Sequence, residues 1–472
     1  MAKSTTTAPS TTARARVRTK SKRLLSAVAM GAVSAVTASV AAAGGAAFAA
    51  PDYPSWNDVE KAKQNESTKQ AEIATLGELL NGLASQAAKA VTTAQIAAEA
   101  YRVTQDALDA ATLRETSLSE QAATAEATAA TSKMRAGLIA AHLAKSGASG
   151  LSLNLFLNGN SADDLLSQLG TASKLSEQSE QIYTEAVQDK NAAESLGEQA
   201  ASATEERERL TEESKTTFDA ATASSTAAEA AYNTQQRKSS ELFEQLALLK
   251  DTTAEAERSF HAGEDAAAAA SAFAQAQASA AAIADAAAAQ AVRDTAAAAA
   301  AQAVRDAAAA AGSGSGSGAG SGSGSGSGSV APSVPATPSP PVALPNASIV
   351  DTALAFANAQ LGDRYVFGGS GPDAWDCSGL TKAAYAAAGV YIGTHSATNQ
   401  YNTMASQGKL VSFAQVQVGD LVFWGSPGNY YHVAIYAGNG QVLEAPNPSS
   451  RVRVHSIWSS WAVAPYVGRP AA

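Results

Sequence analysis

Apolar residues recur at alternating steps of four and three through much of the first half of the chain. Such a stripe runs along one face of a helix, which buries it against a second helix. Residues 50–255 are therefore predicted to form an all-α coiled-coil hairpin. One run of the stripe comprises Ile73, Leu76, Leu80, Leu83, Ala87 and Ala90, and the second comprises Phe218, Ala221, Ala228, Tyr232, Leu242, Leu246 and Leu249.

The pattern changes between the two runs. Residues 151–157 alternate leucine or phenylalanine with polar residues at period two, and Asn158-Gly159-Asn160 follows as a turn signal. These features predict a small irregular head over residues 136–170. Its leucines form either a local mini-core or a patch on which a partner docks, and both interpretations stay open.

Residues 256–311 are nearly pure alanine with an internal repeat. The pentapeptide Gln290–Asp294 returns as Gln302–Asp306, twelve residues later. A period of 12 rotates successive copies by roughly 120° around a helix, so the repeat draws no continuous stripe. The segment is predicted to be a spacer helix. Residues 312–346 follow as a linker that is first Gly/Ser-rich and flexible, and then Pro-rich and stiffer.

The last part of the chain, residues 347–472, has a different composition. It has glycines at regular intervals, short β-branched runs and one alanine-rich helical pattern after Cys377. Of the 27 Phe, Tyr and Trp residues in the chain, 16 lie between Asn346 and Ala472. Large rings bury far more surface than alanine, so these residues are predicted to form one compact domain.

Charge excludes one class of partner. Residues 50–311 carry a net charge of −17, whereas residues 346–472 are neutral overall. Nucleic-acid binding needs clustered Lys and Arg to neutralise phosphates, so nucleic acid is not an expected partner. The sequence also lacks a P-loop, a Cys/His metal cluster and a dinucleotide fingerprint, and neither a cofactor nor a metal is expected.

The first 49 residues resemble a secretion signal. They contain seven basic and no acidic residues, an apolar run over 24–43, and an Ala47-Phe48-Ala49 site. This order predicts a signal peptide over residues 1–49, cleaved after Ala49. The alternative is an uncleaved membrane anchor, because the run is long for a signal core. No second stretch could span a bilayer, so no stable span is expected after cleavage.

Cys377 is the only cysteine, so an exported chain could not use it in an internal disulfide. The order Asp376-Cys377-Ser378 opens a helical pattern, which places the thiol at a helix N-terminus. There the helix dipole and free N–H groups lower a thiol pKa and can hold a developing oxyanion. The alternative interpretation is a small buried hydrophobic residue.

A thiol nucleophile needs a base, and the domain offers three histidines. Residues 431–445 have the pattern of a hairpin. His432 and Glu444 face each other in it only if the turn is centred on Gly438, which requires an odd-length loop or an equivalent bulge. We predict that feature, with Glu444 orienting the imidazole. His395 is expected to be a loop residue and His455 a surface residue.

Four spaced motifs resemble those of NlpC-type cell-wall peptidases, which are papain-like α+β enzymes. They are Arg364-Tyr-Val-Phe-Gly-Gly369, Asp376-Cys-Ser-Gly-Leu380, Val418-Gly-Asp-Leu-Val-Phe423 and His432-Val-Ala-Ile-Tyr-Ala-Gly-Asn-Gly440. The resemblance implies Cys377 as nucleophile and His432 as general base and then acid, with Glu444 as the third polar residue. It further implies that an oxyanion and substrate-binding set comprises Tyr365, Asp376, Ser378 and Ser396.

The chain departs from this pattern at one point. Many relatives carry an arginine just before the serine equivalent to Ser396, where this sequence has Thr394-His395. The contact to a substrate carboxylate, and with it the specificity, is therefore not implied by the resemblance.

The whole order of segments is similar to that of septal hydrolases of Gram-positive bacteria. The resemblance implies a secreted, cell-wall enzyme that cuts the γ-D-glutamyl–diamino-acid bond of peptidoglycan stem peptides. Its coiled coil would restrain the enzyme or dock on an FtsE/FtsX-type division complex. Two alternatives remain: a non-catalytic envelope scaffold that binds peptidoglycan, and an amidase or acyltransferase with the same Cys–His pair.

Overall fold

The computed structural model describes residues 54–147, 162–312 and 343–472, and the contacts reported below lie within one compact unit, residues 51–472. The predicted signal peptide, the leucines at 151–157 and most of the predicted linker lie outside the described residues. No helix in the described ranges is long and apolar enough to cross a membrane.

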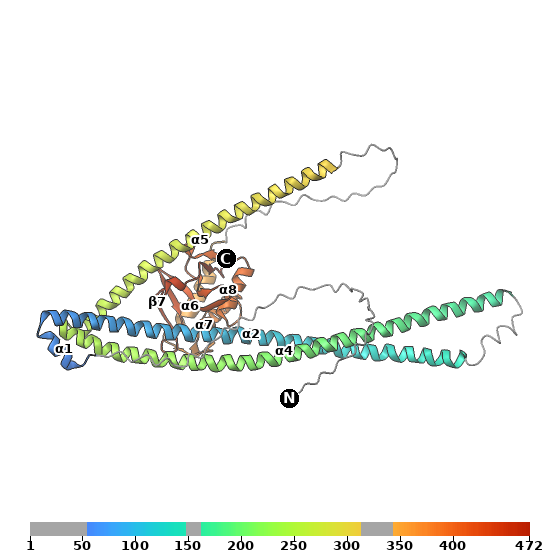
Figure 1. The fold of residues 1–472 in the computed structure, drawn as a ribbon, viewed down its shortest axis with the longest axis horizontal. Coiled ribbons are helices and arrows are strands. Elements are labelled where there is room, and N and C mark those ends of the chain that lie inside the picture. The colour runs from blue at the N-terminus through green and yellow to red at the C-terminus, as the bar shows by residue number, and fades with distance from the viewer. Residues whose placement is uncertain (1–53, 148–161, 313–342) are drawn as a thin grey trace, which may run out of the picture. The chain divides into compact units, whose positions relative to one another are not determined.

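The predicted hairpin is present. Helix α1 (Trp56–Lys63) is followed by two long antiparallel helices, α2 (Glu66–Gly147) and α4 (Ala162–Lys250), which lie side by side along their length (Figure 1). Helix α1 begins with a capping box between Ser55 and Asp58. The base of the hairpin has a core whose buried residues are at most 7% exposed. Val59 and Ala62 come from α1, and the predicted leucines of both runs supply the others: Leu76, Leu80, Leu83, Leu242, Leu246 and Leu249.

The alanine-rich segment is one helix, α5 (Ala254–Gly312), but its two halves have different surroundings. Val292 and Val304, which occupy equivalent places in the repeat, are 70% and 69% exposed, as expected without a continuous stripe. In the first half, the Phe273 ring packs edge-on against Phe413, with centroids 5.5 Å apart, and Ala280 is 2% exposed in the core of the last domain. The segment predicted as a spacer therefore also contacts that domain.

The last domain is built on a six-stranded antiparallel sheet in the order β3-β8-β4-β5-β6-β7. Two further short strands, β1 (Arg364–Tyr365) and β2 (Ala374–Trp375), pair in parallel outside it. The strands of the large sheet are β3 (Leu410–Ser412), β4 (Leu421–Ser426), β5 (Asn429–Gly438), β6 (Gln441–Glu444), β7 (Arg453–Ser456) and β8 (Tyr466–Gly468).

Both faces of this sheet are covered. Helices α6 (Ala347–Ala359), α7 (Cys377–Ala387) and α8 (Ala397–Ser406) pack on the face that presents Phe423, Val433 and Ile435. The alternate residues, including Trp424 and Ala434, belong to a second core, to which α5 contributes Phe273 and Ala280. Side chains alternate along a strand, so one sheet supplies both cores. The predicted α+β domain after a helical hairpin is confirmed.

Candidate active site

Cys377 is the first residue of α7, as predicted. Asp376 caps this helix: its carboxylate accepts a hydrogen bond from the Gly379 amide at 2.8 Å. The Cys377 side chain is buried, and its sulfur interacts with the backbone of Ser378 and of Val433 on β5. The thiol therefore lies where the N-terminus of α7 meets the strand that carries His432.

His432 and Glu444 come together through a bulge. The turn residues are Asn439 and Gly440, and the register of β5 and β6 shifts between Tyr436 and Gly438. This one-residue insertion puts His432 and Glu444 on the same face of the hairpin. The predicted bulge is confirmed. Because Tyr436 pairs with Val442, the paired part of the hairpin is centred on Asn439, and His432 lies diagonally across from Glu444 rather than directly opposite it. The His432 Nε2 and Glu444 Oε2 atoms are 2.6 Å apart, and both side chains are fully buried.

Glu444 has two further partners. Its Oε1 atom lies 2.5 Å from Nε2 of His455, and the Trp458 indole N–H donates to the same carboxylate at 3.2 Å. Burial alone would raise the pKa of Glu444, but the charges and hydrogen bonds of His432 and His455 hold it well below its ordinary value. His455 was expected to be a surface residue; its side chain is 26% exposed, but it also contacts Glu444. The antiparallel pairing of β6 and β7 places it on the same face as Glu444.

The partners of His432 define its tautomer. Glu444 is ionised and can only accept, so Nε2 carries the proton and Nδ1 is the free base. The Nδ1 atom accepts a hydrogen bond from the side-chain amide of Gln95 on α2, at 3.1 Å. The same amide donates to the Pro446 carbonyl at 2.8 Å, and its own oxygen is buried without a partner.

His395 lies in a loop, as expected, and it also contacts the site. Its Nε2 atom is 2.6 Å from Oδ1 of Asp376, while Arg102 of α2 reaches Oδ2 at 3.1 Å. Burial raises the pKa of Asp376, but the His395 hydrogen bond and the nearby positive charges outweigh it and lower the pKa. Asp376 therefore links the start of α7 to the hairpin.

Ser396 is the N-cap of α8, and the helix N-terminus holds a carboxylate. Glu99 of α2 accepts hydrogen bonds from the Ser396 hydroxyl at 2.6 Å, the Ala397 amide at 3.1 Å and the Thr398 amide at 2.9 Å. Glu99 is 4% exposed. Helix N-termini favour anions because their first amides lack intrahelical partners, which explains why Glu99 docks there.

Tyr365 and Ser378 lie beside these groups. Tyr365 is buried on β1, and burial, with the charge of Asp376 as a further cause, raises its phenol pKa well above the ordinary value. The phenol is therefore a neutral hydrogen-bond donor at physiological pH. Ser378 is 2% exposed, and its hydroxyl donates to Asp376 at 3.3 Å. The oxyanion and substrate-binding roles of these residues stay predictions.

Four polar residues of α2 reach the domain, and sequence reasoning missed them. Gln95, Glu99, Arg102 and Asp106 follow steps of four, three and four, so they form one stripe, and Asp106 accepts from the Thr394 hydroxyl. The signal was available, because a polar stripe at heptad spacing marks a contact face as an apolar one does. Through Gln95, this stripe of α2 contacts His432, the candidate catalytic histidine.

This covering changes the state of the thiol. Burial raises the pKa of Cys377 well above its ordinary value, and the charges of Asp376 and Glu99 add to the effect. Backbone groups of Val433 and Ser378 act in the opposite direction but do not outweigh it. The expected lowering at the helix N-terminus is therefore not seen while α2 covers the site, and Cys377 is a thiol rather than a thiolate.

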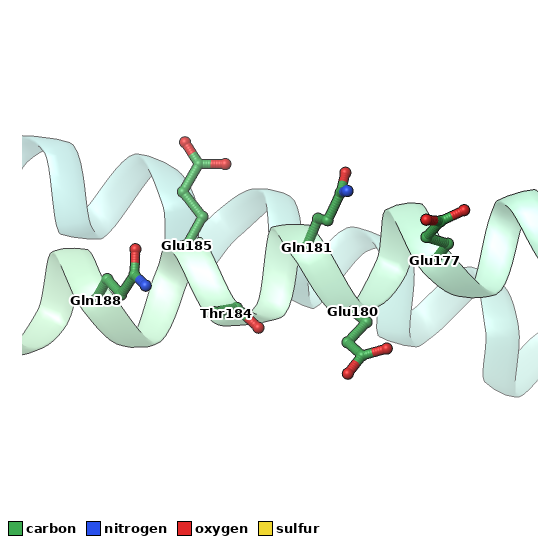
Figure 2. A pocket seen from close by; sticks show the side chains of 6 residues that line it. All are labelled: Glu177, Glu180, Gln181, Thr184, Glu185 and Gln188. Atoms are coloured by element: carbon green, nitrogen blue, oxygen red, sulfur yellow. The ribbon is translucent and has the colours of Figure 1, made fainter. Parts of the chain in front are cut away.

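Two of the hollows that adjoin the hairpin differ in their lining. A cavity of about 310 Å³ lies between α2, α4 and the last domain, and its lining includes Val91, Tyr232, Glu444, His455 and Trp458. The other is a shallow hollow on α4 (Figure 2), where Glu177, Gln181 and Glu185 project on one side and Glu180 on the other. These side chains do not converge on a common point. Within the described ranges, no group of three or more His, Cys, Asp or Glu residues could hold a metal ion.

The Glu99 contact is expected to weaken as pH rises. Burial raises the pKa of Glu99 to about 7, against an ordinary value of 4.5, and outweighs the hydrogen bonds from Ser396 and Thr398. The docked helix therefore binds the Glu99 proton more tightly than an undocked one. Docking is fully supported below pH 4.5 and loses this contribution as pH rises through about 7. Burial also raises the pKa of Asp106, which acts in the same direction.

Hydrogen exchange at the start of α8 measures this effect. After correction for intrinsic rates, the Ala397 and Thr398 amides should exchange faster at pH 8 than at pH 5.5 in the wild type. Glu99→Gln, which cannot ionise, should reduce the difference. An identical pH dependence in the two proteins would show that Glu99 does not control docking.

Comparison with known proteins places the last domain. Residues 362–468 match the NlpC/P60 family. The chain is 41% identical over 105 residues to Protein P54 of Enterococcus faecium, covering 22% of this chain and 19% of that protein. It is 37% identical over 123 residues to a probable endopeptidase of Corynebacterium glutamicum (26% and 54%), and 38% identical over 112 residues to peptidoglycan endopeptidase RipA of Mycolicibacterium smegmatis (24% and 21%).

The chain thus spans between 19% and 54% of the length of these curated relatives. Among solved structures, the P60 domain of an antigen from M. avium subspecies paratuberculosis is 31% identical. That match covers 26% of this chain and 96% of the domain, with a TM-score of 0.24.

Proposed function

Residues 362–468 belong to the NlpC/P60 family, and on this premise we propose that the chain is a cysteine endopeptidase of peptidoglycan stem peptides. The observation that carries the proposal is the arrangement of His432. Its Nε2 atom donates a hydrogen bond to Glu444 Oε2, 2.6 Å away, which leaves Nδ1 as the base. Cys377 is the first residue of α7, and this helix packs on β5, the strand that carries His432. A nucleophile, a base and an orienting carboxylate are the parts that thiol acyl transfer requires.

The proposed substrate bond joins the γ-carbonyl of D-glutamate to the diamino acid. The Cys377 thiol transfers its proton to His432 Nδ1 as the sulfur attacks this carbonyl. His432 then gives the proton to the leaving amine, and an acyl-enzyme remains on Cys377. Water, deprotonated by His432, cleaves the thioester and restores the thiol. The amides at the start of α7 and the Tyr365 hydroxyl are the proposed donors to the developing oxyanion.

The same proposal includes restraint of the enzyme by the hairpin. The Gln95 side chain ends in a γ-carboxamide, the same functional group as the proposed scissile bond, and its nitrogen occupies the lone pair of His432 Nδ1. A substrate amide and Gln95 cannot occupy this position together. Glu99 and Arg102 hold α2 in place by hydrogen bonds to Ser396 and Asp376, of which the Arg102–Asp376 contact is charge-assisted. The described arrangement is therefore proposed to be the inactive state.

Release of α2 would require an agent that pulls on or binds the hairpin. We propose that this is a division complex of the FtsE/FtsX type, reached after export to the cell wall. Support for this partner and for that location comes from the order of segments in the sequence and from the family of the last domain.

Digestion of purified muropeptides tests the proposed reaction. The full-length protein and a variant in which α2 is displaced are incubated with disaccharide-tetrapeptides, and the products are identified by mass spectrometry. The expected products have a new γ-carboxyl on D-glutamate and a new amine on the diamino acid. Cleavage between sugar and peptide would indicate an amidase, transfer of the acyl group to an amine would indicate an acyltransferase, and binding without products a scaffold.

A further inference from the structure

His455 is a histidine of the domain that the proposed reaction does not use. It lies on β7, opposite Val442 of β6, so its side chain shares a face with Glu444, two residues farther along β6. Its Nε2 atom is 2.5 Å from Glu444 Oε1, and its side chain is 26% exposed, whereas Glu444 is fully buried. A buried carboxylate is thus shared by an enclosed imidazole, His432, and a solvent-accessible one.

From this geometry we propose that His455 is a positioning residue for His432 and acts through Glu444. The role rests on the proposed function, since it presupposes that His432 is the base. By holding Oε1, His455 leaves Oε2 in line with His432 Nε2, at 2.6 Å. This contact keeps the Glu444 carboxylate from rotating away from Nε2. His432 therefore keeps its proton on Nε2 rather than on Nδ1.

The packing around this chain of groups supports the assignment. The Trp458 indole N–H donates to both Glu444 oxygens, at 3.2 and 3.4 Å, and its ring stacks on Trp424 with centroids 5.1 Å apart. The Trp424 and Trp458 rings both contact the His432 ring, with centroids 5.2 and 5.4 Å away. The two indoles therefore fix the plane of His432, and His455 fixes the carboxylate behind it.

The charge of His455 gives the contact a second consequence. Protonated His455 neutralises Glu444 and so weakens its stabilisation of protonated His432, because one carboxylate then serves two cations. Besides Glu444, the titratable residues that line the cavity with His455 are Arg453 and Tyr232, and Arg453 has the same sign of charge.

Histidine NMR on the full-length protein tests the proposal without requiring turnover. The chain has five histidines, so 15N-histidine labelling gives a small set of imidazole signals whose shifts report tautomer and charge. In the wild type we expect His432 as the Nε2–H tautomer, with a titration that is coupled to that of His455. His455→Gln keeps an N–H donor to Glu444 but cannot titrate. It should preserve the tautomer and move the His432 midpoint to higher pH.

His455→Ala removes the donor as well. It should introduce the Nδ1–H tautomer of His432 and lower kcat for muropeptide hydrolysis by roughly tenfold, with KM little changed. His261→Gln, on α5, is the matched control and should leave the His432 signals unchanged.

An unchanged His432 tautomer and midpoint in both His455 variants would overturn the proposal. If His455→Ala does not fold, His455→Gln still decides the question. If no muropeptide is cut by any protein, the proposed function fails, while the NMR result on His455 and His432 stands separately.

Discussion

Displacing α2 is expected to convert a slow enzyme into a fast one. Glu99→Arg places a cation where Ser396, Ala397 and Thr398 all present donors, so the helix cannot dock in its described position. Hydrogen bonds contribute about 0.5–1.5 kcal/mol each, and the loss of these three contacts weakens the docking that covers the site. Muropeptide hydrolysis by full-length Glu99→Arg should therefore exceed that of the wild type by roughly tenfold or more.

Thiol alkylation gives a second measure of the same change. Removing α2 exposes Cys377 and takes away the Glu99 charge, and both effects lower the thiol pKa and speed reaction with iodoacetamide. Glu126→Arg is the matched control, because Glu126 is an exposed carboxylate on the same helix. Equal alkylation and equal hydrolysis in Glu99→Arg, Glu126→Arg and the wild type would contradict restraint by α2.

Loss of the sulfur is expected to abolish hydrolysis. Cys377→Ala in the Glu99→Arg background should reduce the rate by about 10³-fold or more, because the acyl-enzyme cannot form. Alanine fits the buried site without adding volume, so the fold should be retained. Comparison of circular dichroism spectra and of binding to peptidoglycan sacculi checks that only the chemistry has changed.

The same variant separates the proposed enzyme from the alternatives. A scaffold that only binds peptidoglycan should behave identically with and without the sulfur. Product formation at the same rate by Cys377→Ala and its parent would rule out Cys377 as the nucleophile. Loss of activity in Cys377→Ala together with normal binding supports the thiol mechanism.

Local patterns predicted the helical hairpin and the start of α7 correctly. Leu76 and Leu80 are buried because heptad spacing puts them on one helix face, and this requires only neighbours along the chain. Asp376 before Cys377 is likewise a local capping signal, and it placed the thiol correctly. The bulge between His432 and Glu444 followed from the period of two along a strand.

Predictions were incomplete or wrong where residues distant in the sequence determine the outcome. His455 joins Glu444 through the pairing of β6 with β7, and His395 joins Asp376 across a loop. The surroundings of Cys377 depend on Glu99, almost 280 residues away, whose charge and burial raise the thiol pKa. The heptad spacing of Glu99 with other polar residues of α2 indicates a contact face, but no periodicity identifies the residues that this face contacts.

The sequence by itself determined which residues could do chemistry and which segments are helices, because both depend on residue type and short-range spacing. The tertiary structure alone decided whether that chemistry is accessible. It places Gln95 on His432 and Glu99 on the N-terminus of α8, contacts that are set by how two separate segments pack. Burial and charge act through space, and the Cys377 thiol, at the start of its own helix, is held in its protonated form by the packing of another helix.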